Sequence, residues 1–126
     1  MLLADQDDSD SHDFRYARVI GIYHVNVVYT GPEMLDYSPR RVDFLWVRWF
    51  RHVGVQSVQW HERRLDSLCF PPMVDSDAFG FVDPRDVLRG CHLIPTFRNG
   101  RLHRDEISLS RCAKDARDWR RYNVNR

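Results

Sequence analysis

The stretch Val42-Asp-Phe-Leu-Trp-Val-Arg-Trp-Phe50 decides the fold class of this chain. It holds two of the four tryptophans, and its aromatic and β-branched residues favour a packed β-strand. Successive side chains of a strand point to opposite faces, and here both faces are mostly apolar. We therefore expect the strand to be covered on both sides, as a central strand or a barrel strand is.

A second β-like run precedes this strand. Residues 16–30 read YARVIGIYHVNVVYT, with an apolar set at the odd positions. Gly21 inside such a run predicts a β-bulge or a sharp bend. Gly31-Pro32 ends the run, because these residues favour turns. Arg40-Arg41 then leads into the central strand, so the two runs are expected to form an antiparallel pair.

Size and composition are those of one β-rich domain. The chain has 126 residues, of which 43% are hydrophobic, enough for a core of its own. Residues 1–13 are polar and acidic and predict a disordered tail, so the domain is expected over 14–126. No apolar run is long enough for a transmembrane helix, and no signal sequence is recognised. The chain is expected to be soluble and not secreted.

Two helices are predicted toward the C-terminus. Asp83-Pro84 is a typical helix start, because Asp caps the N-terminus and Pro fits the first turn; it predicts a short helix near 84–89. Ser110 can cap a second helix near 111–122, with an apolar stripe at Cys112, Ala116, Trp119 and Tyr122. A strand over 91–97 lies between them, and Pro95 places it at a sheet edge or near its end.

The charge distribution suggests a polyanionic partner. Five Asp and no Lys or Arg lie in residues 1–13, and the remainder carries 19 basic against 13 acidic residues. Eighteen of the 19 basic residues are Arg, which suits phosphate or carboxylate; the alternative is a compositional bias of the genome. The contact candidates for DNA are Arg40, Arg41, Arg117, Arg120 and Arg121.

The sequence predicts no catalysis, no cofactor and no metal site. It contains no G-x-S-x-G, no phosphate-binding Gly-rich loop and no C-x-x-C. Cys91 and His92 are neighbours in a predicted strand and would point to opposite faces. The three cysteines are widely spaced and odd in number, so a disulfide framework is not expected.

Several uncommon strings carry a family resemblance. They are YARVIGIYHVNV from Tyr16, DFLWVRWF from Asp43, FPPM from Phe70, DAFGFVDPRDVLRGCHLIP from Asp77 and LSRCAKDARDW from Leu109. Together these strings resemble the C-terminal region of proteins encoded by fungal Plavaka-type transposons, which are related to the KDZ transposases. The resemblance covers about residues 14–126. It implies a fragment of a transposon-encoded protein, or a stand-alone derivative of one, without the nuclease core, which lies elsewhere in those polypeptides. The protein is expected to act in the nucleus.

A further, architectural resemblance is to the bromo-adjacent homology (BAH) domains of chromatin proteins. VRWF at 47–50 and VLRGCHL at 87–93 are similar to segments of those domains. The fold expected is mainly β: a small, partly open SH3-like or BAH-like barrel. The function expected is a non-catalytic accessory module that binds DNA or chromatin. The alternatives are a protein–protein module, either a histone-tail reader using Tyr37 and Trp60 or a docking piece for a transposase, and an inert truncated remnant.

Overall fold

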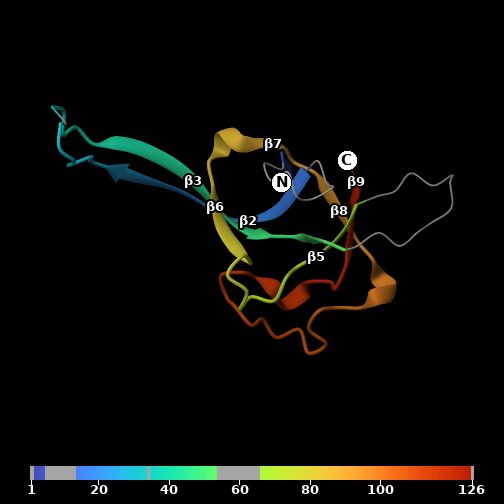
Figure 1. Cartoon of the computed structure of the whole chain (residues 1–126). Helices are drawn as coiled ribbons and strands as arrows, with labels where there is room; N and C mark the ends of the chain where they lie inside the picture. Colours follow the sequence, from blue (N-terminus) through green and yellow to red (C-terminus); the bar gives the residue numbers. More distant parts are fainter. Residues whose placement is uncertain (1, 5–13, 34, 54–65, 126) are drawn as a thin grey trace.

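The computed structural model describes residues 2–4, 14–33, 35–53 and 66–125. The chain is mainly β, as predicted, and its strands form two antiparallel sheets that do not close into a barrel (Figure 1). The strands are β1 (Leu2–Ala4), β2 (Phe14–Val27), β3 (Arg40–Trp49), β4 (Arg51–His52), β5 (Ser67–Cys69), β6 (Phe79–Val82), β7 (Val87–Arg89), β8 (His92–Pro95) and β9 (Tyr122–Asn125). The described residues also form three short 3-10 helices: η1 (Pro84–Asp86), η2 (Phe97–Asn99) and η3 (Asp115–Arg117).

The first sheet has the order β6-β3-β2-β1-β7. The strand that decides the fold class, β3, lies between β2 and β6 and is antiparallel to both. The predicted antiparallel pair is therefore confirmed. So is the covered strand, although only over its second half, because Leu45, Val47, Arg48 and Phe50 are buried whereas 40–43 are exposed.

The second sheet has the order β4-β5-β9-β8. It begins one residue after β3, because Phe50 separates β3 from β4. Its outermost strand, β8, ends at Pro95. The predicted position of Pro95, at an edge and at the end of a strand, is therefore confirmed. Proline lacks the N–H that an inner strand needs for its second neighbour.

Two clusters of buried side chains lie on opposite faces of the first sheet. On one face Tyr16 and Phe50 pack against Leu68, Tyr122 and Val124 of the second sheet. On the other face lie Ala17, Leu45, Val47 and Val82, with Val87 packed against them. The opposite directions follow from the strand period of two, since Tyr16 and Ala17 are neighbours, as are Val47 and Arg48. Both clusters lie near the inner ends of β2 and β3.

A β-bulge interrupts the pairing of β2 with β3. Val19 pairs with Val47 and Gly21 pairs with Trp46, so Ile20 is the extra residue on β2. The bulge predicted at Gly21 is confirmed. It has a consequence that the sequence pattern did not predict. The odd-numbered residues of β2 lie on one face before the bulge and on the other face after it, because one extra residue exchanges the two faces.

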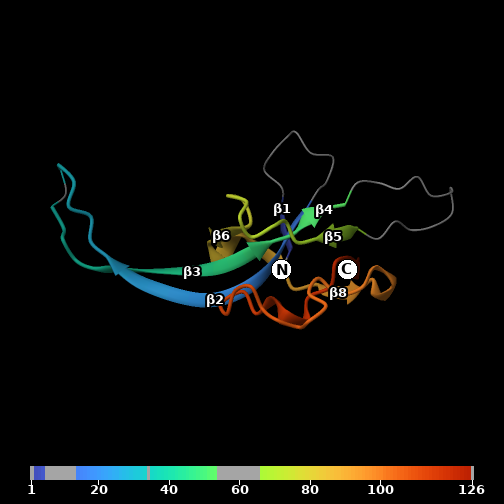
Figure 2. The ribbon, with the colours of Figure 1, turned by 90° about the horizontal axis from the view of Figure 1, so that it is seen from below.

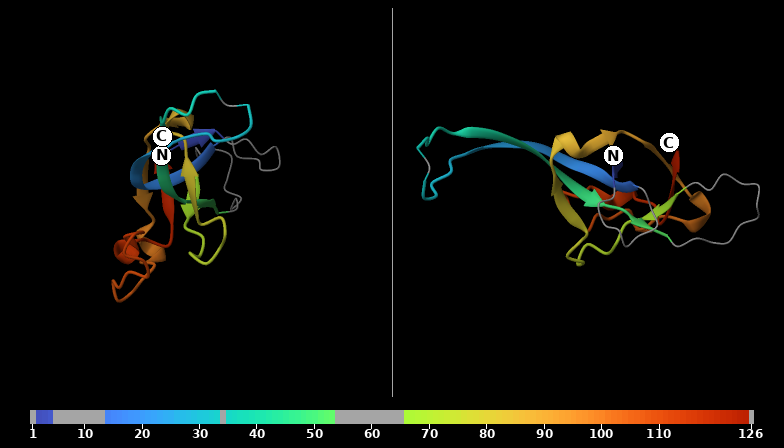
Figure 3. Two further views of the ribbon diagram at one scale, coloured as in Figure 1. Left: turned by 90° about the vertical axis from the view of Figure 1, so that its left-hand side faces the viewer. Right: turned by 45° about the horizontal axis from the view of Figure 1, so that its top comes forward.

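Beyond the bulge, β2 and β3 leave the rest of the molecule as a two-stranded ribbon. We call residues 21–27 and 40–44, with the connecting residues between them, the arm; all else is the body. Figure 1 shows the arm extending to one side of the body, and Figure 2 shows its curvature from below. The right-hand view in Figure 3 shows the same arrangement, whereas the left-hand view looks along the arm. Within the described residues, β1 pairs with β2 only at 14–16 and β6 pairs with β3 only at 45–48.

The predicted disordered tail differs from the structure at its start. Leu2–Ala4 forms β1, which pairs with β2 on one side and with β7 on the other. The backbone of this segment thus lies between β2 and β7 in the first sheet. Residues 5–13 lie outside the described part of the chain.

The helix predicted near 84–89 is wrong in length and type. Asp83 does cap its start, since the carboxylate oxygen accepts a hydrogen bond from Arg85 N at 2.9 Å. The helical part is the single 3-10 turn Pro84–Asp86, and Val87–Arg89 forms β7 instead. Val87 packs against the buried cluster around Val47, and the extended backbone of β7 pairs with β1.

The helix predicted near 111–122 is also wrong. A turn does start at Ser110, whose hydroxyl accepts from Ala113 N at 3.3 Å, but Lys114 has a positive φ of 53°, which ends a right-handed helix. Residues 115–117 form η3, and Tyr122–Asn125 forms β9. Tyr122 and Val124 are both buried, and their spacing of two is that of a strand.

Candidate interaction surfaces

The arm has one apolar face and one polar face. In its register Tyr23 pairs with Phe44, Val25 with Val42, and Val27 with Arg40. Paired residues of antiparallel strands point to the same side, so the side chains of Tyr23, Val25, Val27, Val42 and Phe44 form one surface, which we call the apolar arm face. The alternate residues form the polar arm face, which consists of Ile22, His24, Asn26, Arg41 and Asp43.

The apolar arm face is exposed to solvent and continuous with an aromatic group at the body. Its outward side chains retain a large exposed fraction, for example 47% for Tyr23 and 43% for Val25. Tyr23 stacks on Phe44 with ring centroids 5.6 Å apart, and Phe44 meets the edge of Phe81 at 5.5 Å. Phe81 belongs to β6 and is itself 72% exposed. An exposed apolar strip thus runs from β6 along the arm.

The connecting residues at the end of the arm add further exposed apolar side chains. Leu35 is 97% exposed, and Val28, Tyr29 and Tyr37 are also exposed. Tyr37, predicted as a peptide-binding aromatic, therefore lies at the end of the arm and is accessible. Trp60, its proposed companion, lies outside the described residues.

The outer edge of β3 is open over Arg40–Phe44. No described strand pairs with this edge, because β6 begins its pairing at Leu45. The N–H and C=O groups that point outward from an unpaired edge can accept an added strand. The arm thus offers both an apolar face and a backbone edge.

The five arginines predicted to contact DNA do not form one surface. Arg40 and Arg41 start β3 on the arm, whereas Arg117, Arg120 and Arg121 lie in the C-terminal segment of the body (Figure 1). Arg41 is engaged on the polar arm face by Asp43, with Nε 2.8 Å from Oδ1. Arg120 Nε donates to the carbonyl oxygen of Arg101 at 3.2 Å.

The C-terminal segment nevertheless has a basic surface. In the described part of 98–125, the exposed charged side chains comprise six cations and two acids. The imbalance arises because Asp115 and Asp118 point inward and are buried. The cations are Arg98, Arg104, Arg111, Lys114, Arg117 and Arg120, and the acids are Asp105 and Glu106.

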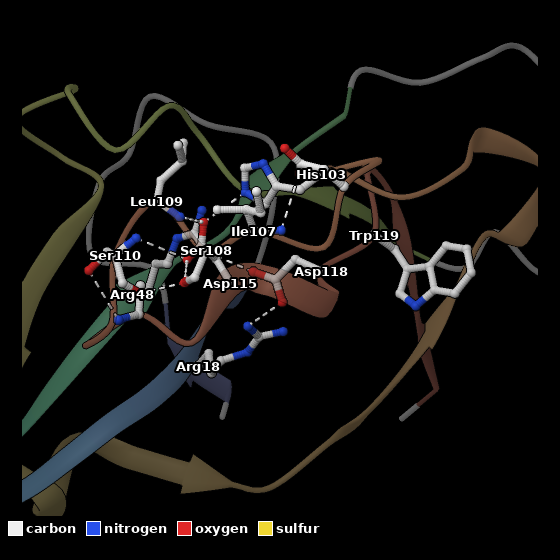
Figure 4. A network of polar contacts seen from close by, with 12 residues as sticks. Arg18, Arg48, His103, Ile107, Ser108, Leu109, Ser110, Asp115, Asp118 and Trp119 are labelled. Atoms are coloured by element: carbon white, nitrogen blue, oxygen red, sulfur yellow. Dashed lines mark hydrogen bonds and ion pairs between the residues drawn. The ribbon is translucent and has the colours of Figure 1, made fainter.

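Asp118 holds this segment to the first sheet through a buried ion-pair cluster (Figure 4). Its two carboxylate oxygens accept from Arg18 Nη1 at 2.6 Å and from Arg48 Nη1 at 2.9 Å. The guanidinium carbon of Arg48 also lies 3.9 Å from the ring centroid of Phe70. Burial lowers the pKa of Arg48, and the nearby carboxylates of Asp118 and Asp115 oppose this shift. The guanidinium remains charged at neutral pH.

Asp115 organises the loop that precedes η3. Its carboxylate accepts from the Ser108 hydroxyl, from Leu109 N and Ser110 N at 3.2 Å each, and contacts His103 Nε2 at 2.7 Å (Figure 4). Burial raises the pKa of the Asp115 carboxyl, but these hydrogen bonds outweigh it and hold the pKa well below its usual range. The cluster therefore stabilises an ionised carboxylate inside the protein.

The same residue types occur in hydrolytic triads, but the contacts differ. In a triad the nucleophilic hydroxyl bonds to an imidazole, and the imidazole in turn bonds to the carboxylate. Here the Ser108 hydroxyl donates directly to Asp115, and His103 contacts the other carboxylate oxygen. Asp115 is therefore a buried carboxylate surrounded by hydrogen-bonding groups. Among the described residues, no group of three or more His, Cys, Asp or Glu side chains could hold a metal ion.

Sequence reasoning missed the buried acids and the two-faced arm. A signal for the first was present, since Arg48 stands in a strand expected to be covered on both sides, and a buried Arg needs an acidic partner. The acid that pairs with Arg48 is Asp118, which lies 70 residues away in the sequence. No local pattern identifies it. The two-faced arm follows from the bulge at Ile20 together with the register of β2 on β3.

Comparison with known proteins gave no match: no family model, no curated protein and no solved structure resembles the chain significantly. No helix in the described part of the chain is long and apolar enough to cross a membrane.

Proposed function

We propose that this protein is a non-catalytic protein–protein interaction module and that the apolar arm face is its contact surface. One observation carries the proposal: the ribbon that leaves the body carries five apolar side chains on one face, whereas the other face carries four polar side chains and Ile22. Contiguous exposed apolar surface of this kind marks interaction sites in soluble proteins. A ribbon that only had to be soluble would have no reason for a one-sided pattern.

The energetics of the arm support the same function. A two-stranded ribbon by itself is marginally stable in water, and the arm has no third strand among the described residues. Apolar side chains at alternate positions of two paired strands can pack on a second sheet, as in β-sandwiches. Burial of each such side chain would contribute roughly 1.5–3 kcal/mol if complete, so a partner both covers and stiffens the arm.

Site-specific photo-crosslinking in extracts of the source cells tests this function. A photoreactive amino acid is placed at Tyr23 on the apolar arm face or at His24 on the polar arm face. We expect defined adducts from position 23, few from position 24, and loss of the position-23 adducts when Val25→Lys is added. Equal adducts from both positions, or none from position 23, would contradict the proposal.

A second candidate function, nucleic-acid binding, is favoured by the charge distribution of the C-terminal segment. Burial of Asp115 and Asp118 leaves its exposed surface with six cations and two acids. Arg side chains bind phosphates bidentately, and phosphate contacts dominate the affinity of proteins for DNA. The candidate residues become those of the body, without Arg40 and Arg41 of the arm.

Binding to a short DNA duplex across a salt series tests this candidate. The triple variant Arg98→Glu, Arg104→Glu, Arg117→Glu should lower the affinity and flatten its salt dependence, since each lost phosphate contact reduces the slope by about 1. The control is Arg41→Glu on the polar arm face, which should bind as the unchanged protein does. Undetectable binding at low salt would remove this candidate.

The transposon-derived origin that the family resemblance implies, and the nuclear location expected of a module that binds DNA or chromatin, belong to the proposal as well. Both fit an accessory module that contacts a transposase or a chromatin protein through the arm. A partner recovered at position 23 would identify which of the two is correct.

A further inference from the structure

We propose that the occupant of the apolar arm face is the same face of a second copy, so that two chains form a twofold-symmetric dimer through their arms. This inference rests on the proposed function, because it names the partner of that same surface.

The middle of the apolar arm face is uncharged. Between Tyr23 and Val27 on β2 and between Val42 and Phe44 on β3, no outward side chain of this face carries a charge. The partner must therefore be apolar over the same area, because an unpaired charge buried against it would be costly. A second copy presents a surface of the same size and the same alternating pattern. Two such faces can pack as two sheets do.

The two ends of the apolar arm face carry opposite charges. Arg40 closes the outer end, in the pair with Val27. Asp83 follows β6 at the inner end, where Val82 pairs with Leu45, so it stands beside Phe44. The twofold axis lies in the interface between the two faces and crosses both strands at the level of the pair Val25–Val42. The outer end of one arm then lies on the inner end of the other.

Arg40 of each copy then lies next to Asp83 of the other, and the interface contains this pair of opposite charges twice. A surface that matches itself in this way is what a twofold interface requires. The hydrogen bonds from Arg85 already keep the Asp83 carboxyl ionised, with its pKa lowered to about 2. Asp83 also forms an ion pair with Arg85, at 2.7 Å. In the dimer Arg40 adds a second cation to this ionised carboxylate.

The bulge at Ile20 is what makes such a dimer possible. Without the extra residue, Tyr23, Val25 and Val27 would lie on the face of Ala17 and Val19, opposite to Phe44 and Val42. With it, the apolar residues of both strands meet on one side. The bulge thus creates the contact surface, in keeping with the use of bulges to redirect side chains at functional sites.

Sedimentation equilibrium of the full chain over a wide concentration range tests the inference. We expect a reversible dimer of the 15.1-kDa chain. Val25→Lys, on the apolar arm face, should weaken association by about tenfold or more, because the new charge is desolvated in the interface. Asn26→Lys adds the same charge at the next position, on the polar arm face, and should leave association unchanged. Circular dichroism verifies that each variant is folded.

A charge exchange provides the second, independent variant. Arg40→Glu should weaken the dimer, and Arg40→Glu combined with Asp83→Arg should restore part of the affinity, since the pair is re-formed with its signs reversed. A chain that stays monomeric at all concentrations, or a dimer that is equally sensitive to Val25→Lys and Asn26→Lys, overturns the inference.

The outcomes also separate the two proposals. A monomeric chain whose Tyr23 position crosslinks to a different protein, with loss upon Val25→Lys, overturns the second copy and supports the interaction module. An adduct with the mass of two chains supports both. Absence of both a dimer and a position-23 adduct overturns both.

Discussion

The strands β2 and β3 run through both the body and the arm, yet the two regions place the same kinds of residue in opposite environments. Val47 and Val42 both belong to β3, but Val47 is fully buried and Val42 is 43% exposed. Arg48 and Arg41 also belong to β3, and each forms an Arg–Asp ion pair, at 2.9 Å and 2.8 Å. Only the pair of Arg48 is buried.

The difference teaches that pattern alone does not decide whether an apolar strand face belongs to a core. Inside the body, β3 has a second sheet over one face and β6 at its edge. On the arm, β2 is the only described strand that pairs with β3. The apolar residues of the arm therefore need a partner that the described part of the chain does not supply, whereas those of the body already have one.

Breaking the two Arg–Asp ion pairs should change the stability of the protein by very different amounts. Asp118→Ala should destabilise the protein by about 3–5 kcal/mol, because it leaves the buried charge of Arg48 without its partner. Asp43→Ala, which removes the exposed partner of Arg41, should cost about 0–1 kcal/mol. Urea unfolding followed by tryptophan fluorescence measures both. Equal costs would mean that burial does not distinguish the two pairs.

A smaller effect compares the two valines of β3. Val47→Ala should cost about 2 kcal/mol, since it leaves a cavity in a buried cluster. Val42→Ala on the arm should lie within about 0.5 kcal/mol of zero. If dimerisation buries Val42, the cost of Val42→Ala will rise with protein concentration, so thermal unfolding at two concentrations sharpens the comparison.

Acid should weaken the body through Asp115. The folded protein holds this carboxyl at a lowered pKa, and the unfolded chain titrates near the ordinary value of about 3.9. Below that pH the unfolded state binds the extra proton, so the contribution of Asp115 is complete at neutral pH and is lost progressively as the pH falls below about 4. Asp115→Asn should be less stable at pH 7 and lose less between pH 5 and pH 3. Urea unfolding at these three values tests the sign.

A local change at the surface is expected for Gly21, next to the bulge. A Cβ atom built there would lie 2.4 Å from Cε2 of Tyr23, so Gly21→Ala must displace that ring from Phe44. The ring is at the surface and can move, so the cost should stay below about 1 kcal/mol. Gly90→Ala is the control, because a Cβ atom there meets nothing within 4 Å. The ring proton shifts of Tyr23 should change in the first variant alone.

Several elements were determined by the sequence itself. The β class follows from the aromatic and β-branched runs, the antiparallel pairing of 17–27 with 40–49 from two such runs around a Gly-Pro turn, and the cap at Asp83 from local chemistry. Gly21 predicted the bulge, and Pro95 predicted the edge strand. These features depend on neighbours in the chain, so local rules suffice for them.

Tertiary structure decided the rest. Residues 111–122 have a helical apolar stripe, yet Asp115 and Asp118 find partners at Ser108, Arg18 and Arg48, and Tyr122 finds a place between two strands. Likewise, whether the valines of β2 face a core or solvent depended on one extra residue and on where β1 and β6 end. Contacts between residues far apart in the chain outweigh local propensity because burial and ion pairing contribute more free energy than the difference between a helical turn and a strand.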